Sequence, residues 1–330
     1  MLDKQLNIIR VCETTTIIFM HSSIMYGGAG IVTPKIPSKF FGFLSWYFFS
    51  FTMELFIFIS GITYGICVNR PNGYYKNFDL IKKKFKRLMI PYFIFGFFYV
   101  APIMKILKIT KDSYINYIIK GIIFAQNCRH LWYLFALFDI FVYIVIFDFL
   151  IDGKNKAELF LLLSIITLIF SRIMTDIMVT KRAFYYLFFF CLGFYFYDKL
   201  EIIYTYFSQH LSVWIILGLI SIPLSLFRRI IYDAIKAIRT IPAICFFIYL
   251  TNILTKFPIY NNFLFKIILK NGMGIYLIHP MVIYFMYLRY GQKEIKPWIM
   301  IFATTFIAFI TSLIISEILR LLHLEFVFGE

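Results

Sequence analysis

Long apolar runs, each close to the length of a membrane-spanning helix, recur along almost the whole chain. The stretch Leu159–Phe170, for example, is apolar nearly throughout. A transmembrane helix needs about 20 such residues, whereas a transmembrane strand alternates apolar and polar residues over about ten. Only 15% of the 330 residues are charged, against roughly 25% in a soluble domain. The sequence therefore predicts an all-α, polytopic integral membrane helix bundle.

Clusters of Gly, Pro, Lys and Arg divide the chain into about ten predicted transmembrane helices. The segment 183–198 is short for a span, so nine or eleven helices also fit the pattern. No appended soluble domain is visible, and we expect residues 1–330 to form a single transmembrane domain. The ten segments are 6–26, 43–67, 88–107, 131–150, 158–175, 183–198, 211–227, 240–255, 273–290 and 298–319.

The chain is strongly basic, with a formal net charge of +16. Its Lys and Arg residues punctuate apolar runs instead of covering a soluble surface, which favours contact with anionic membrane lipids over nucleic acid. The connection from Arg70 to Arg87 is rich in Lys and Arg and contains one acid, Asp79. The positive-inside rule places it in the cytoplasm, and both termini with it. The Lys and Arg residues of the whole chain nevertheless divide evenly between the two predicted sides, with Arg172 left inside a helix, so this orientation depends on one loop.

The five cysteines are scattered, and no two form a CxxC motif. We therefore expect neither a disulfide framework nor a metal site.

Arg10 and His21 are the most informative polar residues, because ionisable groups inside spans are costly and often functional. Eleven residues separate them, which places both on one helix face about 16 Å apart in depth. In one interpretation, Arg10 snorkels to headgroups and His21 bonds a neighbouring helix. In the other, Arg10 binds a phosphate near the cytoplasmic mouth and His21 acts as a general base deeper in the membrane.

The R-x10-H pair begins a series of segments that resemble the membrane-bound acyltransferase-3 family. Its members are polytopic O-acyltransferases of exported or surface glycans. The resemblance covers nearly the whole chain, with five segments in the order that the family shows. These segments are NIIRVCETTTIIFMHSS (7–23), MELFIFISG (53–61), KKKFKRLMIPY (82–92), HLWYLFAL (130–137) and GMGIYLIHP (272–280).

The resemblance implies an acyl group, usually acetyl, taken from cytoplasmic acyl-CoA and placed on a hydroxyl of an extracytoplasmic saccharide or lipid-linked glycan. It implies that Arg10, Lys84 and Arg87 contact the phosphates of CoA. His21 would be the catalytic base or a transient acyl carrier. Most such relatives act in a bacterial inner membrane, and we expect the same location here, with acyl-CoA as the donor substrate and no metal.

Three positions depart from the family pattern. Asn7 stands where many members have an acid, Glu13 occupies a position that is usually small and apolar, and Lys84 replaces an Arg of an R-x-x-R motif. Lys still binds phosphate as a point charge. Glu13 lies one helical turn from Arg10, so we expect it to pair with Arg10 and partly replace the missing acid.

Glu54 is a second catalytic candidate, because a carboxylate near the middle of a span needs a partner. It could orient His21 as the acid of a catalytic triad does, or it could neutralise Arg10. Further candidates for substrate binding are His130, Trp132 and His279. For these the alternative is a capping or interfacial role.

A transporter or flippase for glycan or lipid precursors remains an alternative function, because buried ionisable groups also suit proton coupling. Arg172 and Asp176, one turn apart, are expected to form an ion pair without a direct part in chemistry.

Overall fold

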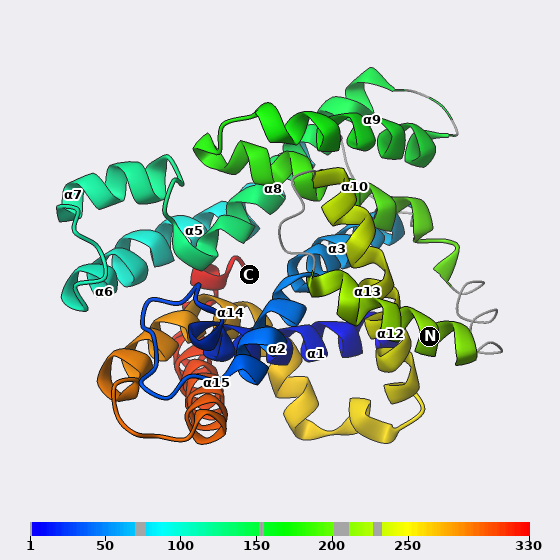
Figure 1. Cartoon of the computed structure of the whole chain (residues 1–330). Helices are drawn as coiled ribbons and strands as arrows, with labels where there is room; N and C mark the ends of the chain where they lie inside the picture. The colour runs from blue at the N-terminus through cyan, green and yellow to red at the C-terminus, as the bar shows by residue number, and fades with distance from the viewer. Residues whose placement is uncertain (1, 70–76, 152, 154, 201–210, 227–232) are drawn as a thin grey trace.

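The structure is a computed structural model that describes residues 2–69, 77–151, 153, 155–200, 211–226 and 233–330. These ranges are mainly helical, which confirms the predicted all-α class (Figure 1). The principal helices are α1 (Leu2–Ser23), α2 (Lys39–Phe49), α3 (Thr52–Val68), α4 (Asn77–Lys84), α5 (Ile90–Phe95), α6 (Ala101–Ile106), α8 (Trp132–Leu150), α9 (Lys156–Phe170), α10 (Thr180–Phe196), α12 (Leu211–Leu226), α13 (Asp233–Leu254), α14 (Phe263–Tyr290) and α15 (Pro297–Leu321).

Short helical turns join several of these helices. The π-helical turns are η2 (Phe85–Met89), η3 (Gly96–Val100) and η4 (Tyr117–Ile123), which follows the single-turn α7 (Tyr114–Asn116). The 3-10 turns are η1 (Ile24–Gly27), η5 (Arg129–Leu131), η6 (Ser171–Ile173), η7 (Ile177–Val179), η8 (Pro258–Asn261) and η9 (Glu325–Phe328).

Seven helical stretches in the described ranges are long and apolar enough to cross a membrane, as expected of a multi-pass membrane protein. They are Lys39–Val68, Phe78–Ile106, Arg129–Leu150, Ile177–Phe196, Lys236–Leu254, Phe263–Tyr290 and Pro297–Leu321.

Each of the ten predicted segments coincides with a helix, but three of these helices differ from ordinary spans. Helices α9 and α12 have 15 and 16 residues, short of the usual span. Helix α1 has 22 residues but is too polar to count among the apolar spans. The segment 183–198, predicted to be short, instead belongs to a helical stretch of 20 residues that starts at Ile177.

Helix α1 is enclosed by the rest of the bundle, in contact with α2, α3, α13, α14 and α15 (Figure 1). Of its residues from Lys4 onward, Thr15 alone is exposed. The other polar side chains of α1 from Lys4 onward are therefore at least partly covered by protein, as a transmembrane bundle requires.

Helices α3 and α10 cross at close range because glycines lie at the contact. A Cβ atom added to Gly61 would lie 2.0 Å from the carbonyl oxygen of Phe190, and one added to Gly193 would lie 2.0 Å from that of Phe58. Small residues let transmembrane backbones approach in this way. This crossing fixes the position of α3, which contributes several residues to the site described below.

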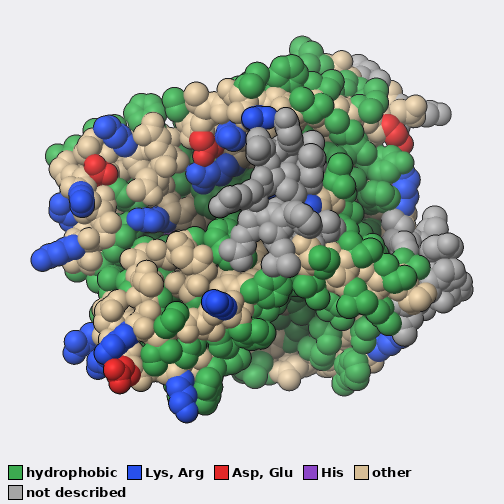
Figure 2. All heavy atoms as spheres, viewed as in Figure 1, with side chains coloured by type: hydrophobic (Ala, Val, Ile, Leu, Met, Phe, Trp, Pro, Cys, Tyr) green, Lys and Arg blue, Asp and Glu red, His purple; other side chains and the backbone are tan. Residues whose placement is uncertain are grey.

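The outer surface is largely apolar, as contact with lipid tails requires. On α15, for example, Phe302, Phe306 and Leu321 are exposed, while Thr304, Ala308 and Ser312 are buried against the bundle. Figure 2 shows hydrophobic side chains over much of one face of the molecule, with Lys and Arg gathered mainly toward one side of the view.

Candidate functional site

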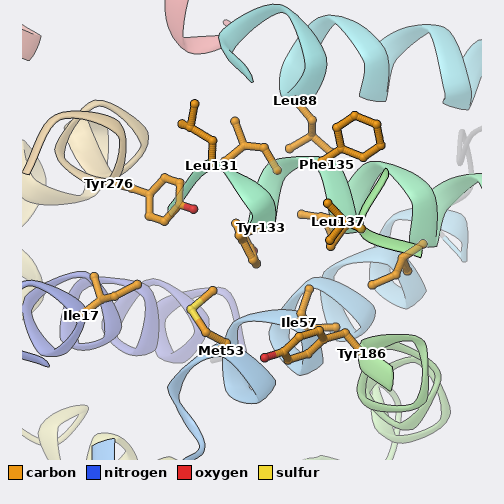
Figure 3. Packing of buried hydrophobic residues seen from close by; sticks show 14 of the residues in the cluster. Ile17, Met53, Ile57, Leu88, Leu131, Tyr133, Phe135, Leu137, Tyr186 and Tyr276 are labelled. Atoms are coloured by element: carbon orange, nitrogen blue, oxygen red, sulfur yellow. The ribbon is translucent and has the colours of Figure 1, made fainter. Parts of the chain in front are cut away.

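A cavity of about 510 Å³ lies inside the bundle. Its walls come from α1, α3, α4, η2, α8 and α14. Figure 3 shows the packing of buried hydrophobic residues in this region, and the lining residues Ile17, Met53, Leu88, Tyr133, Leu137 and Tyr276 are labelled in it. The cavity is thus formed by segments that are far apart in the sequence.

The three residues predicted to bind phosphate, Arg10, Lys84 and Arg87, all line this cavity. Lys84 lies within electrostatic range of both arginines. Three like charges in one cavity repel one another, so an anionic ligand there would be stabilised by all of them.

Hydrogen bonds fix the guanidinium of Arg10. Its Nη2 donates to Thr63 Oγ1 at 2.9 Å, and its Nη1 donates to Asn7 Oδ1 at 3.3 Å. Asn7, which replaces the acid of the family motif, therefore still contacts Arg10. Because the side chains of Asn7 and Thr63 are neutral, they orient the guanidinium without cancelling its charge.

Arg87 lies on the π-helical turn η2, which ends just before α5 and its Pro91. Proline has no N–H to donate, and its ring crowds the preceding helical turn. The wider π-helical turn η2 gives the ring room. The C-terminal residues pack directly against the backbone of Arg87. A Cβ atom added to Gly329 would lie 2.3 Å from the carbonyl oxygen of Arg87. Glu330 lines the cavity and forms an ion pair with Arg320 at 2.6 Å.

Three histidines from distant segments meet beyond the cavity. The ring centroids of His21 and His279 are 5.2 Å apart, and those of His279 and His130 are 6.2 Å apart. His130 and His279 are buried. The structure thus brings together the predicted catalytic histidine and two of the three predicted substrate-binding residues.

Backbone carbonyls determine which ring nitrogens of His130 and His279 carry protons. His130 Nε2 lies 3.0 Å from Leu277 O, and His279 Nδ1 lies 2.8 Å from Ile275 O. A carbonyl oxygen only accepts hydrogen bonds, so these nitrogens are the donors. The other nitrogens, His130 Nδ1 and His279 Nε2, are buried with no hydrogen-bond partner among the described residues.

Tyr276 joins the cavity to the histidines. It lines the cavity, and its ring centroid lies 5.7 Å from that of His130 and 6.3 Å from that of His279. Its hydroxyl donates to the backbone oxygen of His130. Ile17 also lines the cavity, one helical turn before His21 on α1. The cavity therefore extends from the cationic residues toward the histidines.

Glu54 lies in the first turn of α3 and is buried. Its Oε1 accepts a hydrogen bond of 3.0 Å from the hydroxyl of Tyr185 on α10. This partner was not predicted, and neither of the two proposed partners, His21 and Arg10, has a described hydrogen bond or ion pair with Glu54. A triad-like contact with His21 is thus not part of this arrangement.

Glu13 lines the cavity and has no exposed surface. It lies within electrostatic range of Arg10, but the predicted ion pair is not formed among the described residues. Both carboxylate oxygens of Glu13 lack a hydrogen-bond partner in this part of the chain. Arg10 instead bonds the neutral Asn7 and Thr63, as described above.

Trp132 contacts α10 instead of the histidine cluster. Its ring stacks on Tyr186 at a centroid distance of 5.2 Å, and the guanidinium of Arg182 lies 5.3 Å above it.

Arg182 also forms an ion pair with Asp176 at 2.7 Å. The predicted pairing of Asp176 with Arg172 is therefore wrong, because α9 ends at Phe170 and the helical spacing does not continue to Asp176.

Sequence reasoning missed Tyr276 and Thr63 as parts of the site. Tyr276 precedes His279 by three residues on one helix, so the spacing could have identified it. Thr63 has no such signal, since its contact with Arg10 depends on how α1 and α3 pack.

Within the described ranges, no group of three or more His, Cys, Asp or Glu side chains is placed to hold a metal ion.

Comparison with known proteins supports the acyltransferase interpretation. The family model described as an acyltransferase domain, Acyl_transf_3, matches residues 3–317, which is nearly the whole chain. Neither a curated protein nor a solved structure matches significantly. The match includes every residue of the cavity described above except Glu330. On the strength of this match, the chain belongs to the acyltransferase-3 family of membrane acyltransferases.

Proposed function

We propose that this acyltransferase moves an acetyl or related short acyl group from cytoplasmic acyl-CoA to a hydroxyl of an extracytoplasmic saccharide or lipid-linked glycan. The supporting observation is that one cavity is lined by Arg10, Lys84 and Arg87 and also by Tyr276, which contacts the cluster of three histidines. The cations suit the phosphates of CoA. The histidines suit chemistry on a thioester.

In the simplest mechanism, His21 is the general base. It accepts the proton of the acceptor hydroxyl as the hydroxyl oxygen attacks the thioester carbonyl carbon. The C–S bond then breaks, and the proton passes to the sulfur of the departing CoA. If His21 is instead an acyl carrier, its ring nitrogen attacks the thioester carbonyl carbon, the C–S bond breaks, and CoA leaves as the thiol with the imidazole proton. The hydroxyl oxygen then attacks the acyl-imidazole, the C–N bond breaks, and the freed imidazole takes up the hydroxyl proton. In both cases His21 must be neutral at the start.

The basic residues and the expected cytoplasmic loop support a cytoplasmic entry for the donor, with both termini on that side of a bacterial inner membrane. Helix α1 is continuous from Arg10 to His21, about 16 Å along its axis. A donor with a long flexible arm could therefore be held at its phosphates while its thioester lies deep in the membrane.

The test is a release assay in membrane vesicles supplied with acetyl-CoA and the cell-surface glycan. His21→Asn should abolish release of free CoA while the variant remains inserted. His323→Asn is the matched control, because His323 is exposed and lies outside the site. Normal activity of His21→Asn would contradict the mechanism. Movement of a glycan precursor across the vesicle membrane without CoA release would favour the transporter alternative.

The cationic residues have their own test. Arg87→Ala should raise KM for acetyl-CoA by about ten- to a hundredfold, since a charge-assisted contact with phosphate contributes roughly 1.5–3 kcal/mol. Lys86→Ala is the control, because Lys86 is an exposed neighbour that does not line the cavity. An equal KM for the two variants would count against phosphate binding by Arg87.

A further inference from the structure

We infer that the carboxyl group of Glu13 recognises the amide N–H groups of the donor's pantetheine arm. This inference rests on the proposed function, since it takes acyl-CoA as the donor. Glu13 is fully buried, lines the cavity and has two oxygens with no hydrogen-bond partner in the described ranges. A buried carboxyl that lacks partners is costly. A ligand that supplies hydrogen-bond donors in the cavity would remove that cost.

Two hydroxyl groups, one beside Glu13 in the sequence and one on the cavity wall, already donate elsewhere. The hydroxyl of Thr14 donates to the backbone oxygen of Arg10 at 2.8 Å. The hydroxyl of Ser60 donates to the backbone oxygen of Phe56 at 2.9 Å. These hydroxyl hydrogens are therefore not available to Glu13. Both oxygens of Glu13, a residue of the cavity wall, are thus left as acceptors without a described donor.

The depth of Glu13 indicates which part of the donor it would meet. On α1, Glu13 lies about 4.5 Å beyond Arg10 and about 12 Å before His21. A donor with its phosphates at the cations and its thioester at the histidines must pass Glu13 with the segment between these ends. In acyl-CoA this segment is the pantetheine arm, whose polar groups include amides. An amide N–H is a suitable donor to a carboxyl oxygen in either protonation state of Glu13.

Glu13 would also help to set the register of the donor. Its acidic group favours neutral N–H donors, while a phosphate group moved to the same depth would meet another acid. Arg10, one turn away, favours the phosphate instead. The two residues together therefore discriminate between the ends of the donor by charge. A small apolar residue in place of Glu13, as in the family pattern, could not repel a misplaced phosphate in this way.

The experiment measures binding of acetyl-CoA, and of analogues in which one pantetheine amide N–H is replaced by an ester oxygen, to the detergent-solubilised full chain. We expect at least one analogue to bind the unchanged protein about tenfold more weakly than acetyl-CoA. Glu13→Ala should weaken acetyl-CoA binding by a similar factor. The same variant should then bind that analogue and acetyl-CoA equally, because the contact is already lost.

Two controls separate this inference from its alternatives. Glu158→Gln, at an exposed glutamate on α9, should bind every ligand as the unchanged protein does. Ligand-free Glu13→Gln should melt no lower than the unchanged protein, since the carboxyl has no described partner to lose. A lower melting temperature would indicate a structural role and overturn the inference.

The remaining outcomes are also decisive. If the effects of Glu13→Ala and of the analogue multiply, Glu13 does not contact that amide, and the inference fails if this holds for every amide. If acetyl-CoA binding needs Arg87 but not Glu13, the inference fails while the proposed function stands. If the unchanged protein binds no acetyl-CoA, the proposed function fails and the inference fails with it.

Discussion

The close crossing of α3 and α10 allows a sharp test of the structure, because one added methyl group should disturb it. A Cβ atom at Gly61 would lie 2.0 Å from Phe190 O, whereas ordinary van der Waals contact begins at 3.4 Å. The two helices would have to separate locally by more than an ångström in Gly61→Ala. Overpacking of this kind costs about 1–3 kcal/mol, and sometimes more.

Alanine also has a higher helix propensity than glycine, by about 1 kcal/mol, so the variant needs a control that gains the same propensity without a clash. Gly272→Ala provides it. The nearest atom to a Cβ at Gly272 is Thr14 Oγ1 at 3.8 Å, which is ordinary contact. The difference in stability between the two variants therefore measures the clash at Gly61, and we expect it to be about 1–3 kcal/mol or larger.

The assay is unfolding of the purified protein in detergent, followed by circular dichroism for the two variants and the unchanged chain. Gly272→Ala should unfold at or above the denaturant concentration of the unchanged protein, and Gly61→Ala clearly below it. Equal stability of the two alanine variants would show that α3 and α10 are farther apart than described, and the position of Thr63 beside Arg10 would then be in doubt.

Three further predictions concern single contacts. Thr63→Val removes a hydrogen bond to Arg10 that contributes roughly 0.5–1.4 kcal/mol. KM for acetyl-CoA in vesicles should therefore rise about two- to tenfold, with kcat little changed. An unchanged KM would contradict this role of Thr63. Tyr185→Phe removes the hydroxyl that donates to Glu54 and should lower the free energy of unfolding by about 1–3 kcal/mol, whereas retained stability would mean that the bond contributes little. Asn271→Ala leaves Glu317 and Ser316 without a shared partner and should destabilise the protein by about 1–3 kcal/mol in the same unfolding assay.

The helices were predictable because lipid imposes a strong pattern on the sequence. Every predicted segment contains a helix, since the run length and the absence of charge are local properties. The start of α14 was not predicted. It begins at Phe263, ten residues before the expected boundary, because the helix includes polar residues such as Lys270 and Asn271 that bond Glu317 on α15. The length of an apolar run in the sequence carries no information about such a contact between two helices.

The site was predictable only in part, for a related reason. Arg10 and His21 share one helix, so their spacing alone places them on one face. The approach of His130 and His279 to His21 depends on how three helices pack, which no spacing within one helix records. The same is true of Glu54, whose hydrogen-bond partner Tyr185 is on a helix far along the chain. The roles of these residues in catalysis remain predictions.

The polarity of α1 bears on how the protein is made. A charged residue near the centre of an isolated transmembrane helix costs about 2.5–3.5 kcal/mol at insertion, and α1 contains both Arg10 and Glu13. The helices that enclose it include α14 and α15, at the far end of the chain. At about 5–20 residues per second, the ribosome needs roughly 10 to 50 s to reach them after completing α1. Helix α1 is thus synthesised well before α14 and α15, and it gains its full set of enclosing helices only when they follow.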